Sequence, residues 1–393
     1  MPPVATYAAL CLANYRPLSE DEPLSDLSNL SCAFTFTGTT DEAWFYQISM
    51  AIEAGGAPAL PLMLEAIQAA RQGDCYAVTQ RLDAMAQILD VINCTLKRMY
   101  EKCDTQIFYH RMRKYLAGSK GMQYSGLPNG VWLDDGISAK NYRQFAGISN
   151  AQSSLIQFFD GVLGVEHRPT GIKPGAEPQA TALVPSDGSV ARHGFIHEMR
   201  TYMPGPHRRF LEHIDRVANI RSFVTARRSN LTLCAAYDSC LEELRRLRDL
   251  HFQIVYRYVI AESRRVQTGA ESATDLTLTP KLLKLGKTKS KASEQASNQH
   301  RGTGGTELVP FLKQARDETT ESRTSRLKSV AKKNSPRPKD QGDIGSKAGY
   351  VSHFGQAAQM WWLGGRGVNG KAKGFITPAL LLSLVAMLVY SLS

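Results

Sequence analysis

The sequence lacks the features that mark several large enzyme classes. It contains no GxSxG nucleophile elbow, no HExxH zinc motif and no phosphate-binding loop ending in lysine. Its seven cysteines are scattered and include no CxxC pair, which argues against a disulfide framework and favours a reducing compartment. No segment shows the alternation of apolar and polar residues that is typical of a β-strand. We therefore expect an all-α protein whose chemistry does not depend on a nucleophilic serine or a structural zinc site.

Excess positive charge is absent from most of the chain, although the formal net charge is +11. Residues 261–374 carry 21 lysines and arginines against 10 acidic residues, so this stretch accounts for the whole surplus. It lacks the pattern of aromatic residues placed between basic residues that proteins binding single-stranded nucleic acid use. A solvated or membrane-proximal basic linker is therefore favoured, and we expect no nucleic-acid partner.

The two ends of the chain differ in their resemblance to membrane-directed segments. The N-terminus has no basic residues before its apolar run and makes a poor secretory signal. Residues 375–392, FITPALLLSLVAMLVYSL, carry no charge and follow Arg366, Lys371 and Lys373. Such a stretch is just long enough to cross a bilayer of about 30 Å. We expect a tail anchor with the body of the protein on the cytosolic side; a buried terminal helix is the alternative.

Apolar periodicity predicts a helical body followed by polar segments. Helices are predicted over residues 41–54, 57–72, 77–102, 105–117, 152–163, 195–202, 206–215, 220–225 and 233–260. The expected units are an all-helical domain at 1–262, a mobile loop at 263–300, a glycine-rich segment with a short helix at 301–319, a disordered basic linker at 320–374 and a transmembrane helix at 375–392.

One predicted helix, residues 241–260, places a histidine in the middle of an apolar stripe. A histidine in this position is most often a core residue with its hydrogen bonds satisfied. The alternative is an axial ligand, because a neutral imidazole in a dry helical pocket binds haem iron well. The stripe alone leaves both open. Its members recur at spacings of three and four: Leu244, Leu247, His251, Val255 and Tyr258.

Three further stretches contain residue types that suit a ligand pocket. Phe108 and Tyr109 precede Arg113, a set that can hold an aromatic amino acid by its ring and carboxylate, although core packing with a surface arginine is the commoner explanation. The small residues and hydroxyls in 145–167 line a ligand or simply cap a helix. The glycines of 301–316 indicate backbone that approaches a ligand closely, or an ordinary flexible turn.

These stretches occur in an order that resembles indoleamine 2,3-dioxygenase, the haem enzyme of tryptophan breakdown. The resemblance runs over most of residues 1–316. It implies that the small N-terminal helical domain of that family is lacking here, while the basic linker and the anchor extend beyond the resemblance. The matching segments are YAALCLANY (7–15), IFYHRMRKYLAG (107–118), FAGISNAQSSLIQFFDGVLG (145–164), MRTYMPGPHRRFL (199–211), AAYDSCLEELRRLRDLHFQIVYRYV (235–259) and GTGGTELVPFLK (302–313).

The resemblance implies haem b as cofactor, with His251 as the proximal iron ligand. L-Tryptophan or a related indoleamine and dioxygen would be the substrates, and Arg113 matches the arginine that binds the substrate carboxylate. Other positions implied in the substrate pocket are Tyr7, Leu10, Phe45, Ser49, Phe108, Tyr109, Leu116, Ser149 and Thr303. Positions implied around the haem are Ser149, Asp160, Arg248, Gly302 and Gly304.

The implied reaction cleaves the indole 2,3-bond with both oxygen atoms retained, giving N-formylkynurenine, the first step of the kynurenine route to NAD. No side-chain base is needed, which agrees with the absence of an acid–base pair. We expect a monomer with its body in the cytosol, on the cytoplasmic face of a membrane. Two alternatives stay open. One is a haem-binding but catalytically impaired member, because the small N-terminal domain of the family is lacking and Ile148 stands where the family's distal loop has a glycine; Asn150 likewise replaces a small residue there. The other is a tail-anchored helical scaffold without haem.

Overall fold

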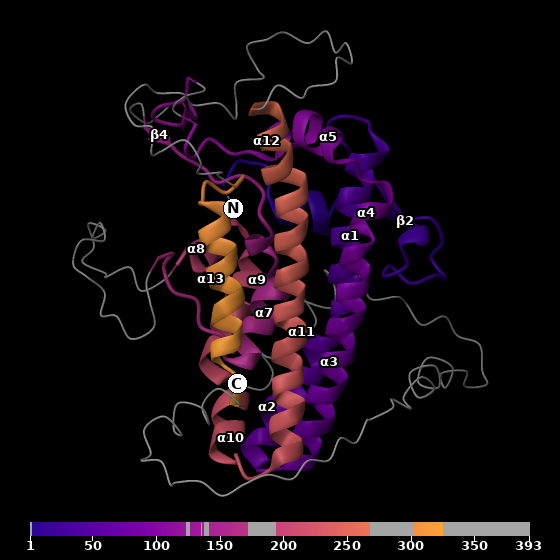
Figure 1. Cartoon of the computed structure of the whole chain (residues 1–393), viewed down its shortest axis with the longest axis vertical. Helices are drawn as coiled ribbons and strands as arrows, with labels where there is room; N and C mark the ends of the chain where they lie inside the picture. Colours follow the sequence, from indigo (N-terminus) through magenta and orange to yellow (C-terminus); the bar gives the residue numbers. More distant parts are fainter. Residues whose placement is uncertain are drawn as a thin grey trace, which may run out of the picture.

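A computed structural model describes residues 2–122, 126–134, 136, 141–171, 194–267 and 302–324. Within this part of the chain the protein is mostly helical, as predicted, with its longest helices lying side by side (Figure 1). The predicted transmembrane helix, most of the basic linker and most of the loop expected at 263–300 lie outside the described residues.

The helices follow the predicted periodic segments closely. The α-helices are α1 (Thr40–Gly56), α2 (Ala59–Gln72), α3 (Cys75–Lys97), α4 (Met99–Lys102), α5 (Thr105–Ile107), α6 (Arg113–Leu116), α7 (Ser154–Leu163), α8 (Phe195–Glu198), α9 (Gly205–Val217), α10 (Ile220–Ala226), α11 (Leu231–Val255), α12 (Glu262–Gln267) and α13 (Leu308–Glu321). Short 3₁₀ turns are η2 (Leu27–Asn29), η5 (Asn150–Gln152) and η6 (Met199–Tyr202). Segments with π-helical geometry are η1 (Ala8–Leu12), η3 (Phe108–Met112) and η7 (Tyr256–Ala261).

Local side chains explain where the main helices begin and end. Thr39, Asp74 and Asn230 accept hydrogen bonds from backbone amides in the first turns of α1, α3 and α11. Such caps satisfy amides that have no partner inside the helix. Helices α2 and α7 stop at Gly73 and Gly164, whose φ values of 80° and 67° are left-handed and favour glycine.

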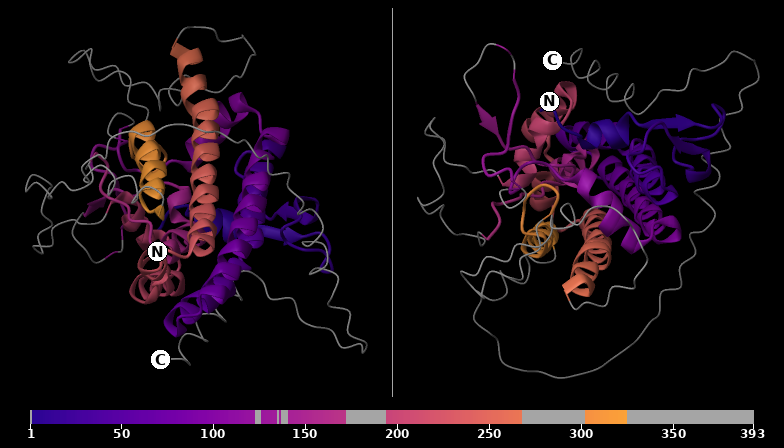
Figure 2. Two further views of the ribbon diagram at one scale, coloured as in Figure 1. Left: turned by 60° about the horizontal axis from the view of Figure 1, so that its bottom comes forward. Right: turned by 90° about the horizontal axis from the view of Figure 1, so that it is seen from above.

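Helix α11 forms the centre of the bundle and packs against both α3 and α13 (Figures 1 and 2). On α3, Leu82, Met85 and Leu89 share one face and are fully buried. On α11, Leu244 and Leu247 are buried in the same core. Each such side chain contributes about 1.5–3 kcal/mol by leaving water. This packing fixes the long helix that carries His251.

The three π-helical segments were not predicted. In η3, the expected helix over 105–117 continues from α5 into α6 but widens by about one residue per turn. In η7, the helix that follows α11 does the same. Segment η1 contains Leu10 and directly follows Tyr7. Segments η1 and η3 therefore fall at or beside positions that the resemblance places in the pocket, and η7 holds Tyr258, whose ring meets that of Phe108.

Two short antiparallel ribbons were also missed. Strands β1 (Tyr15–Pro17) and β2 (Leu30–Cys32) pair with each other, as do β3 (Val131–Trp132) and β4 (Tyr142–Arg143). Strands of two or three residues are too short to show alternation in the sequence, which explains why none was expected.

Two further boundaries differ from expectation. Helix α12 occupies Glu262–Gln267, where the mobile loop was expected to begin. Helix α13 runs to Glu321, and Thr324 still bonds Asp238, so the ordered chain continues past residue 320. One stretch of the described chain, Thr40–Gln72, matches a membrane span by length and apolarity, but it consists of core helices α1 and α2.

Candidate active site

His251 lies near the end of α11, half-buried, and faces the loop that precedes α7. The Asn150 amide Nδ2 lies 3.1 Å from its Nε2. An amide NH₂ only donates, so this contact leaves a lone pair on Nε2 directed at the loop. Burial, helped by the nearby Arg248 cation, lowers the pKa of His251 to about 4. The imidazole is therefore neutral at physiological pH.

The loop opposite His251, which we call the distal loop (Gly147–Asn150), is held by backbone contacts on both sides. The Ile148 amide donates to the Leu116 carbonyl at 3.0 Å. The Thr303 hydroxyl donates to the Ile148 carbonyl at 2.5 Å, and the Gly147 amide donates to the Thr303 carbonyl at 3.1 Å. The structure thus brings the glycine-rich turn Gly302–Gly305 and Leu116 against the distal loop.

Two glycines make this close approach possible. A Cβ placed on Gly118 would lie 2.2 Å from the Phe145 carbonyl oxygen, and one on Gly147 would lie 2.2 Å from the Leu116 carbonyl oxygen. No side chain fits at such a distance. Gly118 and Gly147 therefore allow two backbone segments to pack directly against each other.

The predicted aromatic and cationic residues form two neighbouring pairs. The rings of Phe45 and Phe108 lie 5.4 Å apart, and Phe108 meets Tyr258 edge-on at 5.5 Å. The Arg113 guanidinium lies 5.5 Å from the Tyr109 ring centre. Burial lowers the pKa of Arg113, so its charge is poorly solvated and favours a nearby anion. This arrangement suits an aromatic ring that bears a carboxylate.

Tyr7 is directed elsewhere, into a buried hydrogen-bond cluster. Its hydroxyl donates to Glu53 Oε1 at 2.9 Å, and the Ser153 hydroxyl donates to the same oxygen at 2.6 Å. Burial raises the pKa of the Glu53 carboxyl to about 7. The Tyr7 backbone amide donates to Gln152, whose side chain in turn donates to the Gly147 carbonyl. Tyr7 therefore supports the distal loop through Gln152, and Leu10 is buried beside it.

The remaining predicted side chains are engaged locally. Ser49 donates to the Phe45 carbonyl of its own helix at 3.4 Å, and Ser149 caps η5. The Gly302 amide donates to the Thr306 carbonyl within the glycine-rich turn. A Cβ on Gly304 would meet the Phe195 ring at 2.6 Å.

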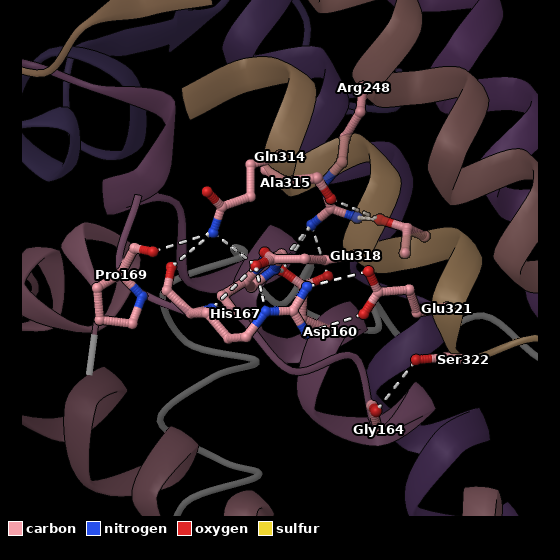
Figure 3. A network of polar contacts seen from close by, with 12 residues as sticks. Asp160, Gly164, His167, Pro169, Arg248, Gln314, Ala315, Glu318, Glu321 and Ser322 are labelled. Carbon is pink, nitrogen blue, oxygen red and sulfur yellow. Dashed lines mark hydrogen bonds and ion pairs between the residues drawn. The ribbon is translucent and has the colours of Figure 1, made fainter. Parts of the chain in front are cut away.

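Arg248, one turn before His251 on α11, forms a buried ion pair with Asp160 of α7. One guanidinium nitrogen of Arg248 lies 2.6 and 2.7 Å from the two oxygens of Asp160, and the other donates to the Thr319 hydroxyl at 2.6 Å (Figure 3). The Arg248 cation holds the pKa of Asp160 below its usual range despite burial. Two residues that the resemblance places separately around the haem thus contact each other.

Several residues of this region were not singled out from the sequence. Glu53 could have been recognised as a buried carboxyl, because it is the one acidic residue within the apolar run SMAIEA of α1. Gln152 lies inside a quoted motif but was not assigned a role. The contact of His167 with Glu318 joins residues 151 positions apart, for which no local pattern exists.

No cluster of three or more potential metal-binding side chains occurs in the described residues. All seven cysteines fall within the described ranges and are free thiols, as expected. A haem iron needs only one or two protein ligands, so a single neutral histidine beside an aromatic pocket is the feature that matters here.

Comparisons with known proteins match this arrangement. The family model for indoleamine 2,3-dioxygenase matches residues 1–322. The chain is 38% identical to the indoleamine 2,3-dioxygenase of Saccharomyces cerevisiae over 81% of its own length and 68% of the relative's. It is 34% identical to the 6-hydroxytryptophan 2,3-dioxygenase of Fusarium equiseti, covering 82% and 70%, and 30% identical to indoleamine 2,3-dioxygenase 1 of Rattus norvegicus, covering 81% and 68%. The chain belongs to the indoleamine 2,3-dioxygenase family.

Proposed function

We propose that this protein is a haem-dependent dioxygenase that opens the indole ring of L-tryptophan. The 2,3-bond is cleaved and each of its carbons receives one atom of dioxygen, giving the ketone and formamide of N-formylkynurenine. This is the first step of the kynurenine route. Membership of the family supports both the reaction and the haem requirement.

The residues around His251 suit a haem. Its imidazole is neutral, its Nε2 lone pair faces the distal loop, and the contact it makes there is an exposed amide that can withdraw. His251 would therefore hold the iron, with Ser149, Gly302 and Gly304 on the loop side. Asp160 and Arg248 would support the part of the site that lies one turn before His251 on α11. When bound, haem supplies the centre that activates dioxygen.

The side chains of the pocket would position the amino acid rather than exchange protons with it. Phe45, Phe108 and Tyr109 offer ring faces and edges for the indole. Arg113 would pair with the carboxylate, and Thr303 would approach the ammonium end. Ser49 and Leu116 would complete the walls, and Tyr7 would support the distal loop through Gln152. Holding the reacting atoms in one geometry is a large contribution to rate where no acid–base step is required.

The observation that carries the proposal is the convergence of three separate segments: the one that holds Phe108 and Arg113, the distal loop, and helix α1. Leu116, three residues after Arg113, bonds Ile148 directly, and Phe108 packs on Phe45 of α1. A charged guanidinium, aromatic rings and a tightly held loop are what recognition of an aromatic amino acid requires.

The test is a haemin titration of the full chain, followed by turnover. We expect saturable binding of one haem per chain. With reductant and isotopically labelled dioxygen, tryptophan should yield N-formylkynurenine that carries two labelled oxygens. Haem binding without turnover would favour the catalytically impaired alternative, for which the buried Ile148 in the distal loop is the motivation. Failure to bind haem would refute both.

We further propose that residues 375–392 anchor the protein in a membrane as a monomer, with its body on the cytoplasmic face. The uncharged run after Arg366, Lys371 and Lys373 supports this. The full chain should remain in the membrane fraction after an alkaline carbonate wash, and a chain ending at Gly374 should not. Equal solubility of both chains would contradict the anchor.

A further inference from the structure

Helix α13 contacts both sides of the candidate site. Its N-terminal end follows the Gly302–Gly305 turn, where Thr303 exchanges two hydrogen bonds with the distal loop. Its C-terminal half lies along α11 and reaches the Asp160–Arg248 pair through Thr319 (Figure 3). A change that detaches α13 from the core should therefore also weaken the contact between the glycine-rich turn and the distal loop.

His167 joins α13 to the core through both of its ring nitrogens. Nδ1 lies 2.6 Å from Glu318 Oε2 on α13, and Nε2 lies 3.1 Å from Asp160 Oδ2 on α7 (Figure 3). The three side chains are only 10%, 2% and 7% exposed. A neutral imidazole carries one N–H and can donate to only one carboxylate. Both contacts are satisfied together only by the imidazolium.

The charges around this site also require the imidazolium. Asp160 and Glu318 contribute two negative charges, whereas Arg248 contributes one positive charge and points at Asp160. Arg168 faces the site as well: its Nε lies 3.6 Å from Glu318 Oε1, while its two terminal nitrogens pair with Glu321 at 2.8 and 3.0 Å. With His167 protonated, these six groups are neutral in sum. Without its proton, the cluster holds a buried excess negative charge, which is costly.

The titration behaviour agrees with this geometry. Burial alone lowers the pKa of His167, but Asp160 and Glu318 together raise it above its ordinary value. Contacts with His167, together with Gln314 and the Arg168 amide, lower the pKa of Glu318 despite its burial. Because the folded pKa of His167 is raised, its stabilising contribution is complete below about pH 6.5 and is lost as the pH rises through the raised value.

We propose that His167 is a positioning residue which, as the imidazolium, clasps α13 to α7 and thereby keeps the Gly302–Gly305 turn against the distal loop. The effect on substrate use rests on the proposed dioxygenase function, whereas the clasp itself does not. Release at alkaline pH should weaken the tryptophan site without changing the haem ligand.

The direct test is hydrogen–deuterium exchange of residues 302–324 in the full chain, corrected for intrinsic rates, at about pH 6.5 and about pH 8.5. In the unmodified protein, protection should fall about tenfold or more at the higher pH, as expected for loss of a charge-assisted hydrogen bond. His167→Gln should show the lower protection at both values. Equal protection of His167→Gln and the unmodified protein at both values would overturn the proposal.

Glu318→Gln provides a second variant that does not remove the clasp. A glutamine amide donates to Nδ1 of a neutral imidazole while Nε2–H still donates to Asp160, so α13 should stay seated at both pH values. His213→Gln, on α9 and outside this cluster, is the matched control and should behave like the unmodified protein. If Glu318→Gln keeps the full pH-dependent loss of protection, the imidazolium is not the cause.

Turnover separates this proposal from the proposed function. If the protein oxidises tryptophan, His167→Gln should raise KM about five- to tenfold near neutral pH with kcat within about twofold, and Glu318→Gln should remove the alkaline rise in KM. A KM unchanged in His167→Gln would refute the link to substrate use. If no oxidation occurs, the exchange measurements still decide on the clasp.

Discussion

Replacing His251 by alanine should abolish stoichiometric haem binding and reduce dioxygenase activity to background. Removing groups that only orient a metal ligand already weakens metal binding about 10–100-fold, so loss of the ligand itself should weaken haem binding by more than about 100-fold. The measurement is a haemin titration followed by the spectrum of the reduced, carbon-monoxide-bound protein.

Two comparisons separate ligation by His251 from a role in folding. Adding imidazole to His251→Gly should restore a histidine-like spectrum, because a free imidazole can occupy the space left by the side chain. His213→Ala should bind haem like the unmodified protein. A normal haem spectrum in His251→Ala would show that another residue holds the iron.

Replacing Arg113 by alanine should lower kcat/KM for tryptophan by about 100–1,000-fold while leaving the haem spectrum intact. Charge-assisted hydrogen bonds contribute about 1.5–3 kcal/mol each, and a guanidinium makes up to two with a carboxylate. The loss should fall mainly on transition-state positioning, because the carboxylate fixes where the indole lies. Steady-state kinetics with both tryptophan and tryptamine measure it.

Tryptamine provides the decisive comparison, since it keeps the indole and the amine but has no carboxylate. Arg113→Ala should change its kcat/KM by no more than a few-fold. Arg111→Ala, an exposed arginine in the same helical segment, should affect neither substrate. An equal loss for tryptophan and tryptamine would mean that Arg113 supports the fold of the pocket instead of binding the carboxylate.

The parts of this fold that depend on local pattern were predictable from sequence. The apolar periodicity of α1, α3 and α11 is a local signal, and these helices begin within about two residues of where it placed them. The resemblance identified segments that converge, such as the one around Arg113 and the distal loop.

Other features depend on geometry that the sequence does not record. The pairing of His167 with Glu318 joins distant segments, and the Tyr7 hydroxyl donates to the buried carboxyl of Glu53, a contact that no local pattern indicates. The short ribbons and the π-helical segments leave no periodic trace, because each alters only a few residues.

The π-helical segment η3 has a consequence for how specificity in this pocket can change. It spans Phe108–Met112 and directly precedes Arg113, the first residue of α6. Because a π-helical turn holds about one residue more than a regular turn, removing one residue there would restore regular α-helix and leave the direction of α6 almost unchanged. The side chains within the widened turn would move around the helix relative to Arg113, although no pocket side chain had been exchanged. In such a helix, length is a variable of substrate choice in its own right, and a single-codon deletion can do what a set of substitutions would otherwise have to do.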